Sequence, residues 1–151
     1  IGFDFKGHAV TRQFDPQLGP VPVIPNELEQ VLLNLLKNAA QAIHQRTDKR
    51  EPGRIILRTK LNPPWAQIQV EDNGVGMPEH VRKRIFEPFF TTKEVGQGTG
   101  LGLSVSYFII TNNHKGQMEV HSTLGQGTCF TLRLPLAGNL IAAQESTKVE
   151  L

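Results

Sequence analysis

The stretch "FTTKEVGQGTGLGLSVS", residues 90–106, carries glycine at every second position from Gly96 to Gly102. Each glycine costs about 0.5–1 kcal/mol relative to alanine in regular structure, so this regular spacing needs a reason. The glycines run directly into the apolar segment "LGLSVSYFII", which predicts a helix. Backbone amides without side chains at a helix N-terminus attract anions. The pattern therefore indicates a loop that closes over phosphate groups, with a flexible linker as the alternative.

The common phosphate-binding motifs do not match this stretch. The dinucleotide fingerprint GxGxxG requires a third glycine, whereas Gly98-x-Gly100 leads to Leu103. The Walker pattern GxxxxGK[ST] requires a lysine after its last glycine, and none follows here. The sequence therefore predicts neither a Rossmann turn nor a P-loop.

Composition limits the remaining classes of function. The 151 residues suit one domain, and 38% hydrophobic with 20% charged residues predict a packed core. A formal net charge of +2 is too small to argue for binding to nucleic acid or to an anionic membrane. Cys129 is the only cysteine, the five histidines lack metal-ligand spacing, and no apolar run is long enough to span a bilayer.

The order of predicted elements is strand, helix, two strands, short helix, loop, helix, two strands. In the clearest helix, which follows Asn26, apolar residues recur on one face, and Asn26 with Glu29 is close to a capping box. Pro78 is expected at the first position of the short helix. The expected strands are 6–14, 54–60, 66–72, 117–123 and 129–135, and the expected helices are 27–43, 79–86 and 101–113. This order predicts an α+β fold, a two-layer α/β sandwich with helices on one face of a sheet.

Amide side chains form a row on the polar side of the first helix. Asn34, Asn38 and Gln41 are spaced i, i+4 and i+7, so they share one face. Asparagine is a mediocre helix former, so two of them one turn apart need an explanation. A carboxamide oxygen suits Mg²⁺, which takes phosphate oxygens as further ligands. A solvated helix face is the alternative.

The segment "VEDNGVGM" places Asp72 at the end of a strand, with Gly74 and Gly76 close behind. A carboxylate at this point can accept a hydrogen bond from an exocyclic amine such as that of adenine. The glycines would let the ring lie against bare backbone. A simple Asx-type turn is the alternative.

These stretches, in this order, resemble the ATP-binding catalytic domain of sensor histidine kinases, in the superfamily shared with gyrase, heat-shock chaperone ATPases and mismatch-repair ATPases. "QVLLNLLKNAAQA" looks like the N box of that family, and "EDNGVGM" looks like the first glycine box. "IFEPFFTTK", "GQGTGLGLS" and "GTCFTLRLP" look like the phenylalanine box, the second glycine box and the strand that follows. The similarity runs from about Phe3 to Leu136 and is greatest to nitrogen-regulation-type kinases.

The resemblance implies a Bergerat-type fold with a mixed sheet and a glycine-rich ATP lid, in a catalytic domain of residues 1–137 followed by a polar tail, 138–151. It implies that Asn38 coordinates Mg²⁺ and that Asn34 and Lys93 act near the phosphates. In gyrase-like relatives a glutamate that activates water stands at the position of Asn34, and an amide cannot act as that base. The implied nucleotide-binding residues are Asn34, Asn38, Gln41, Asp72, Gly74, Gly76, Phe90, Thr91, Thr92, Lys93, Gly98, Thr99, Gly100, Leu101, Gly102, Leu103 and Thr128.

Two details depart from or add to the family pattern. Many members carry a lysine or arginine where this chain has Gln41, so Lys37 or Lys93 would have to supply positive charge to the phosphates. Phe89 and Phe90 would anchor the lid, although aromatic residues in this stretch are equally explained as part of the core.

The resemblance also implies partners. Members of the family phosphorylate a histidine in a stretch like "H-E-[IL]-[RN]-x-P", and no such stretch surrounds any of the five histidines of this chain. The γ-phosphoryl group of Mg²⁺-bound ATP would pass to a histidine on a separate dimerisation domain, and then to an aspartate on a response-regulator receiver domain. We expect a cytoplasmic fragment of a longer protein, without contact to nucleic acid or membrane. An ATPase or an anti-sigma-type serine kinase of the same fold, and a non-catalytic nucleotide-sensing module, remain alternatives.

Overall fold

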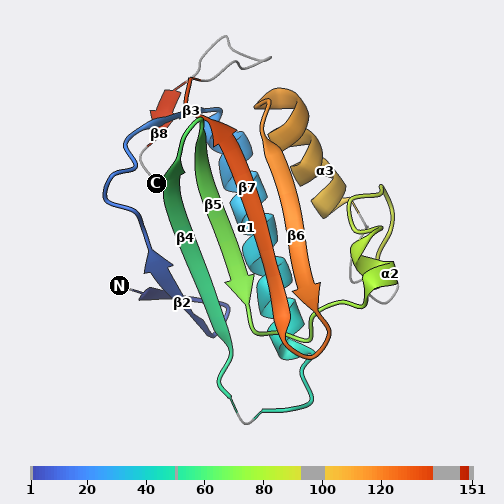
Figure 1. Ribbon diagram of the computed structural model, residues 1–151. Helices are drawn as coiled ribbons and strands as arrows, with labels where there is room; N and C mark the ends of the chain where they lie inside the picture. Colours follow the sequence, from blue (N-terminus) through green and yellow to red (C-terminus); the bar gives the residue numbers. More distant parts are fainter. Residues whose placement is uncertain (1, 50, 93–100, 138–146, 150–151) are drawn as a thin grey trace.

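The computed structural model describes residues 2–49, 51–92, 101–137 and 147–149. Its centre is a six-stranded sheet in the order β1-β2-β4-β5-β7-β6 (Figure 1). The strands are β1 (Gly2–Phe5), β2 (His8–Gln13), β4 (Arg54–Asn62), β5 (Trp65–Asp72), β6 (Gln117–Thr123) and β7 (Gly127–Pro135). β2 and β4 run parallel, whereas the other neighbouring strands are antiparallel. The mixed sheet is therefore confirmed.

Helices cover one face of this sheet, as the sequence predicts. The helices are α1 (Pro25–His44), α2 (Glu79–Arg82), α3 (Gly102–Phe108) and the π-helix η1 (Ile109–Asn113). Figure 1 shows α1 and α3 on the same side of the sheet. On β6 the buried residues Met118 and Val120 alternate with exposed polar residues. This alternation is typical of a sheet with one face in the core and one in water.

The first long helix begins two residues earlier than predicted, so the Asn26 cap is wrong. Its N-cap is Ile24, which is extended (φ −92°, ψ 105°) and makes no side-chain capping bond. Pro25 has a fixed φ that suits the first helical turn, and it forces the residue before it to be extended. Asn26 therefore lies inside the helix. The apolar face is confirmed by the buried residues Leu28, Val31, Leu35, Ala39, Ala40 and Ile43.

The short helix is also shorter than predicted. α2 ends at Arg82, and Pro78 is its extended N-cap (ψ 159°) rather than its first helical residue. After Arg82 the chain turns so that Ile85 is buried and Phe86 stacks on Tyr107, with ring centroids 4.7 Å apart. Tertiary packing thus overrides the helical pattern of residues 83–86.

The second long helix is regular only as far as Phe108, and its last turn is the π-helix η1. This turn buries His114 completely. The His114 Nδ1–H donates to the Ile109 carbonyl (2.9 Å), and Nε2 accepts the Ile24 N–H (3.0 Å). His114 is therefore a packing residue, which ties the start of α1 to η1.

A second, two-stranded sheet joins distant parts of the chain. β3 (Val21–Val23) pairs antiparallel with β8 (Thr147–Val149), a strand that the sequence analysis does not predict. Residues 138–146 of the predicted tail lie outside the described residues. Within the described ranges, no helix combines the length and the apolar character needed to cross a bilayer.

Candidate functional site

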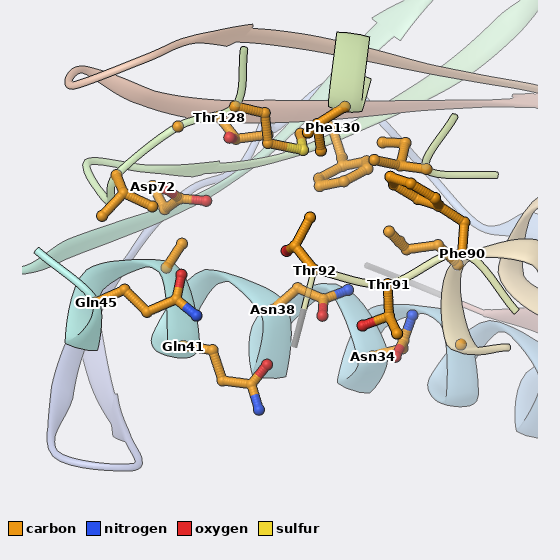
Figure 2. A pocket seen from close by; sticks show the side chains of 18 residues that line it. Asn34, Asn38, Gln41, Gln45, Asp72, Phe90, Thr91, Thr92, Thr128 and Phe130 are labelled. Atoms are coloured by element: carbon orange, nitrogen blue, oxygen red, sulfur yellow. The ribbon is translucent and has the colours of Figure 1, made fainter. Parts of the chain in front are cut away.

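A cavity of about 420 Å³ lies between α1, the end of β5, the start of β7 and the start of α3. Figure 2 shows Asn34, Asn38 and Gln41 on α1 and Gln45 at its C-cap, across from Asp72 and Thr128 on the sheet, with the Gln41 side chain directed away from these two. The predicted site residues that line the cavity are Asn34, Asn38, Gln41, Asp72, Gly76, Phe90, Thr91, Thr92, Gly102, Leu103 and Thr128. The structure therefore gathers into one cavity residues that the sequence separates by up to 94 positions, from Asn34 to Thr128 (128 − 34 = 94).

Two predicted residues lie outside the cavity lining. Gly74 packs against α1, where an added Cβ would lie 2.5 Å from the Ala42 carbonyl carbon. Leu101 is the N-cap of α3, and its carbonyl accepts the Val105 N–H. Both therefore have roles in the packing of the helices. Lys93, Gly98, Thr99 and Gly100 lie outside the described residues.

The sequence analysis missed several lining residues: Ala42, Gln45, Val75, Met77, Val81, Ile85 and Phe130. Gln45 follows Gln41 by four positions, so helical spacing alone could have added it to the amide row. The others are apolar, and an apolar side chain that walls a cavity has the same sequence pattern as one in the core.

Asp72 is the buried carboxylate of the cavity, with 7% of its surface exposed. Its Oδ1 accepts the Gly74 N–H at 2.8 Å. Loss of water around the carboxylate raises its pKa to about 6, against the lowering effect of the Gly74 and Thr128 backbone N–H groups. Asp72 is thus an acceptor that lacks most of the solvation a free carboxylate has.

The backbone behind Asp72 is close-packed through two glycines with positive φ. At Gly76 (φ +68°) an added Cβ would lie 2.1 Å from the Thr123 carbonyl oxygen. At Gly127 (φ +135°) it would lie 2.0 Å from the Asp72 carbonyl oxygen. Only glycine allows this approach of backbone to backbone. These contacts fix the end of β5 and with it the position of Asp72.

At the other end of the cavity, Asn34 joins α1 to α3. Its Nδ2 donates to the Oγ of Ser106 at 3.3 Å, and Ser106 is 1% exposed. An added Cβ at Gly102 would lie 2.5 Å from the Asn34 Oδ1. Figure 2 shows Asn34 toward Thr91 and Gln45 toward Asp72, so the amide row spans the length of the cavity.

The two phenylalanines before the glycine loop differ. Phe90 lines the cavity, with the Arg84 guanidinium 4.6 Å from its ring centroid. Phe89 has positive φ (67°) and is 73% exposed, so the core explanation does not hold for it. Lys37, considered as a source of phosphate charge, is exposed and does not line the cavity.

A two-layer sandwich with this cavity beside its helical layer defines a class of ATP-binding domains. The chain belongs to the family described as histidine kinase-, DNA gyrase B- and HSP90-like ATPases, whose model matches residues 24–138. It is 44% identical over 125 residues to the signal transduction histidine-protein kinase AtoS of Escherichia coli, which covers 82% of this chain and 19% of AtoS. It is 38% identical over 137 residues to the sensory histidine kinase/phosphatase NtrB of Klebsiella oxytoca, covering 84% of this chain and 37% of NtrB. The chain thus spans a minor part of these relatives.

Solved structures agree with this assignment. The catalytic domain of histidine kinase ThkA superposes with a TM-score of 0.70 at 30% identity, over 84% of this chain and 79% of that one. Full-length ShkA in complex with AMPPNP superposes with a TM-score of 0.67 at 27% identity, over 87% of this chain and 26% of ShkA. The predicted fold class and the resemblance to nitrogen-regulation-type kinases are therefore confirmed.

Proposed function

We propose that this chain is the ATP-binding catalytic part of a sensor histidine kinase. It would bind Mg²⁺-ATP in the cavity and donate the γ-phosphoryl group to a histidine on a separate dimerisation domain, for onward transfer to an aspartate on a response-regulator receiver domain. The observation that carries the proposal is the cavity itself, because it has a buried carboxylate at one end and paired amides at the other. The named kinases among the relatives support it.

The Asp72 end suits adenine. A carboxylate accepts hydrogen bonds only, so it favours the amino group of adenine, whereas guanine would present a carbonyl oxygen at the same position. Met77, Ile85 and Phe130 give this cavity apolar walls against which a base can pack. Gly76 would let the ring approach the backbone. Buried acceptors of this kind discriminate strongly, since a wrong partner leaves them unpaired.

The Asn34 end suits phosphates and Mg²⁺. Among the described residues, no group of three or more His, Cys, Asp or Glu side chains could hold a metal ion. The amide oxygens of Asn38 and Asn34 fit an ion that arrives already bound to phosphate oxygens and water. Mg²⁺ would neutralise charge on the transferring group when bound. Gln41, Thr91, Thr92, Gly102, Leu103 and Thr128, together with Lys93, Gly98, Thr99, Gly100 and Leu101, stay candidates for contacts to the nucleotide.

In the proposed transfer, a nitrogen of the acceptor imidazole attacks the γ-phosphorus in line with the bond to the β-phosphate. The P–N bond forms, the P–O bond breaks, ADP remains in the cavity, and the imidazole proton passes to a base of the acceptor domain. Positioning and charge neutralisation account for most catalysis of this kind. Because Asn34 is an amide, it cannot deprotonate water, which favours transfer over hydrolysis.

Three large apolar side chains are exposed: Phe89 (73%), Phe108 at the end of α3 (56%) and Leu33 on α1 (45%). Single exposed apolar residues are normal on a protein surface, so the acceptor domain is proposed from the named kinases among the relatives. We place the activity in the cytoplasm, where ATP is available. The described part of the chain contributes no helix able to span a membrane.

Calorimetric titration of the 151-residue chain tests the site. We expect the wild type to bind ADP and AMPPNP but not GDP, and Asp72→Ala to lose ADP binding. Asn38→Ala should lose mainly the increment in affinity that Mg²⁺ adds. Gln30→Ala is the matched control, since Gln30 is an exposed amide on the same helix outside the cavity. A wild type that binds no adenine nucleotide would refute the proposal, and equal binding of ADP and GDP would refute the role of Asp72.

A further inference from the structure

Ser106 is a buried polar residue next to the cavity, but it does not line it. Its hydroxyl accepts the Nδ2–H of Asn34, which does line the cavity. The bond is part-buried, because Ser106 is 1% exposed whereas Asn34 reaches the cavity, so it acts on a side chain that is otherwise free to turn. Ser106 therefore restrains the amide of Asn34 from outside the binding surface.

A second contact from the same helix acts on the other half of that amide. The first residue of α3, Gly102, leaves room for the Asn34 Oδ1, which would lie 2.5 Å from a Cβ at this position. α3 thus holds the nitrogen through Ser106 and accommodates the oxygen at Gly102. The two contacts together select one of the two orientations that a free carboxamide adopts.

We propose that Ser106 is a positioning residue for Asn34. By holding Nδ2, it makes Oδ1 the atom that Asn34 presents toward the Mg²⁺-bound phosphates. This inference rests on the proposed function. Without Ser106 the amide would rotate, and a fraction of the molecules would present N–H, which repels a cation. The position of α3 would thereby set how strongly Mg²⁺ contributes to nucleotide binding.

The test measures AMPPNP affinity with and without Mg²⁺ on the 151-residue chain. For Ser106→Ala we expect the Mg²⁺-dependent gain in affinity to fall about two- to tenfold, the range of one net hydrogen bond, with Mg²⁺-free affinity unchanged. In an Asn34→Ala background, Ser106→Ala should cause no further loss, because Ser106 acts through Asn34. Ser104→Ala is the matched control, since its hydroxyl bonds the Leu101 carbonyl of its own helix (2.9 Å).

A merely structural serine gives a different result. In that case Ser106→Ala lowers Mg²⁺-free and Mg²⁺-dependent affinity together, or its loss persists in the Asn34→Ala background, and either result overturns the inference. A Mg²⁺-dependent gain equal to that of the wild type also overturns it, while leaving the proposed function intact. A wild type without AMPPNP binding overturns both.

A ligand-free readout completes the test. In the wild type, the side-chain amide protons of Asn34 should show a nuclear Overhauser effect to Ser106 and one defined cross-peak. In Ser106→Ala that cross-peak should shift and broaden, and an unchanged cross-peak contradicts the inference. If Ser106→Ala does not fold, Ser106→Cys keeps the packing with a weaker acceptor and serves for the same measurements.

Discussion

The two ends of the cavity are built by different means. At the Asp72 end, Gly76 and Gly127 bring backbone against backbone, with an added Cβ 2.1 and 2.0 Å from carbonyl oxygens. At the Asn34 end, Gly102 faces the tip of a side chain at 2.5 Å. A carbonyl fixed in a sheet cannot yield, whereas the end of an asparagine side chain can rotate. One end is therefore held by contacts of backbone with backbone, and the other by a side-chain hydrogen bond and a side-chain contact.

The difference matches what each end would bind. An adenine ring is rigid and the same in ATP and ADP, so a fixed acceptor such as Asp72 suits it. The phosphates and their metal ion change during transfer, so the groups around them have to respond. Glycine serves both ends, but substitution at the Asp72 end should damage folding, and substitution at the Asn34 end should damage ligand geometry.

The largest expected effect is on Gly127→Ala. Positive φ costs about 1–3 kcal/mol, and a side chain forced into close-packed backbone costs about 1–3 kcal/mol more. We therefore expect the free energy of unfolding to fall by about 2–6 kcal/mol in urea denaturation. Gly125→Ala is the matched control, since Gly125 also has positive φ (+83°) but no atom within 4 Å of the added Cβ. Equal losses of stability in the two variants would show that the positive φ alone accounts for the loss, without a contribution from the close contact with backbone.

Neutralising Asp72 should stabilise the fold. Its pKa is raised from 3.8 to about 6 in the folded chain, so the folded state binds more protons between these values and stability falls as pH rises through that window. Asp72→Asn should thus be more stable than the wild type by about 1–3 kcal/mol at pH 7.5, and this advantage should vanish near pH 4.

Asp15→Asn is the control of opposite sign. Backbone N–H groups of Leu61 and Gln17 lower the pKa of Asp15, so this half-buried carboxylate favours the folded state once it is ionised. Its neutralisation should not raise stability at pH 7.5. An Asp72→Asn variant less stable than the wild type at pH 7.5 would show that the carboxylate is better accommodated than its burial indicates.

The same titration predicts weaker nucleotide binding in acid. With a pKa of about 6, the ionised fraction of Asp72 falls about tenfold between pH 7 and pH 5, and only the ionised carboxylate is a full acceptor for the adenine amine. We expect ADP affinity to fall by up to about tenfold over this range. The phosphates of ADP also titrate in this range. The same calorimetric pH series on Asp72→Asn corrects for them, since the asparagine amide has no charge to lose. Parallel pH profiles for the two proteins would contradict this origin.

Much of the fold could be predicted because periodicity and turn residues are local. The apolar spacing of α1 and the pairing of β4 with β5 follow from residues close in sequence. The π turn at the end of α3 could not, because it depends on buried His114 bonding to Ile24, 90 positions earlier. The early end of α2 has a similar cause, since Ile85 packs into a core that distant segments form.

The residues of the candidate site also divide into those that the sequence identifies and those that only the structure identifies. Asp72 ends a strand just before two glycines, and the amides of α1 recur at helical spacing, so both patterns can be recognised in the sequence. Gly74 belongs to the same motif as Asp72 but packs against Ala42, a contact that no local sequence pattern reveals. Met77 and Phe130 are missed because the sequence cannot distinguish a cavity wall from the core. Sequence thus identifies the unusual polar groups, whereas the packing around them requires the structure.

The smallest expected effect on stability is on Gly102→Ala, and it separates the two ends most directly. Alanine is a better helix residue than glycine by about 0.5–1 kcal/mol, and the group it meets is the movable tip of Asn34. We expect the free energy of unfolding to change by less than about 1 kcal/mol, while the Mg²⁺-dependent gain in AMPPNP affinity falls because the Asn34 oxygen is displaced. Urea denaturation and calorimetry on the same preparation measure both quantities. If Gly102→Ala destabilises the fold as much as Gly127→Ala does, the Asn34 end is as rigid as the Asp72 end. In that case, α3 is fixed to α1 before any nucleotide binds.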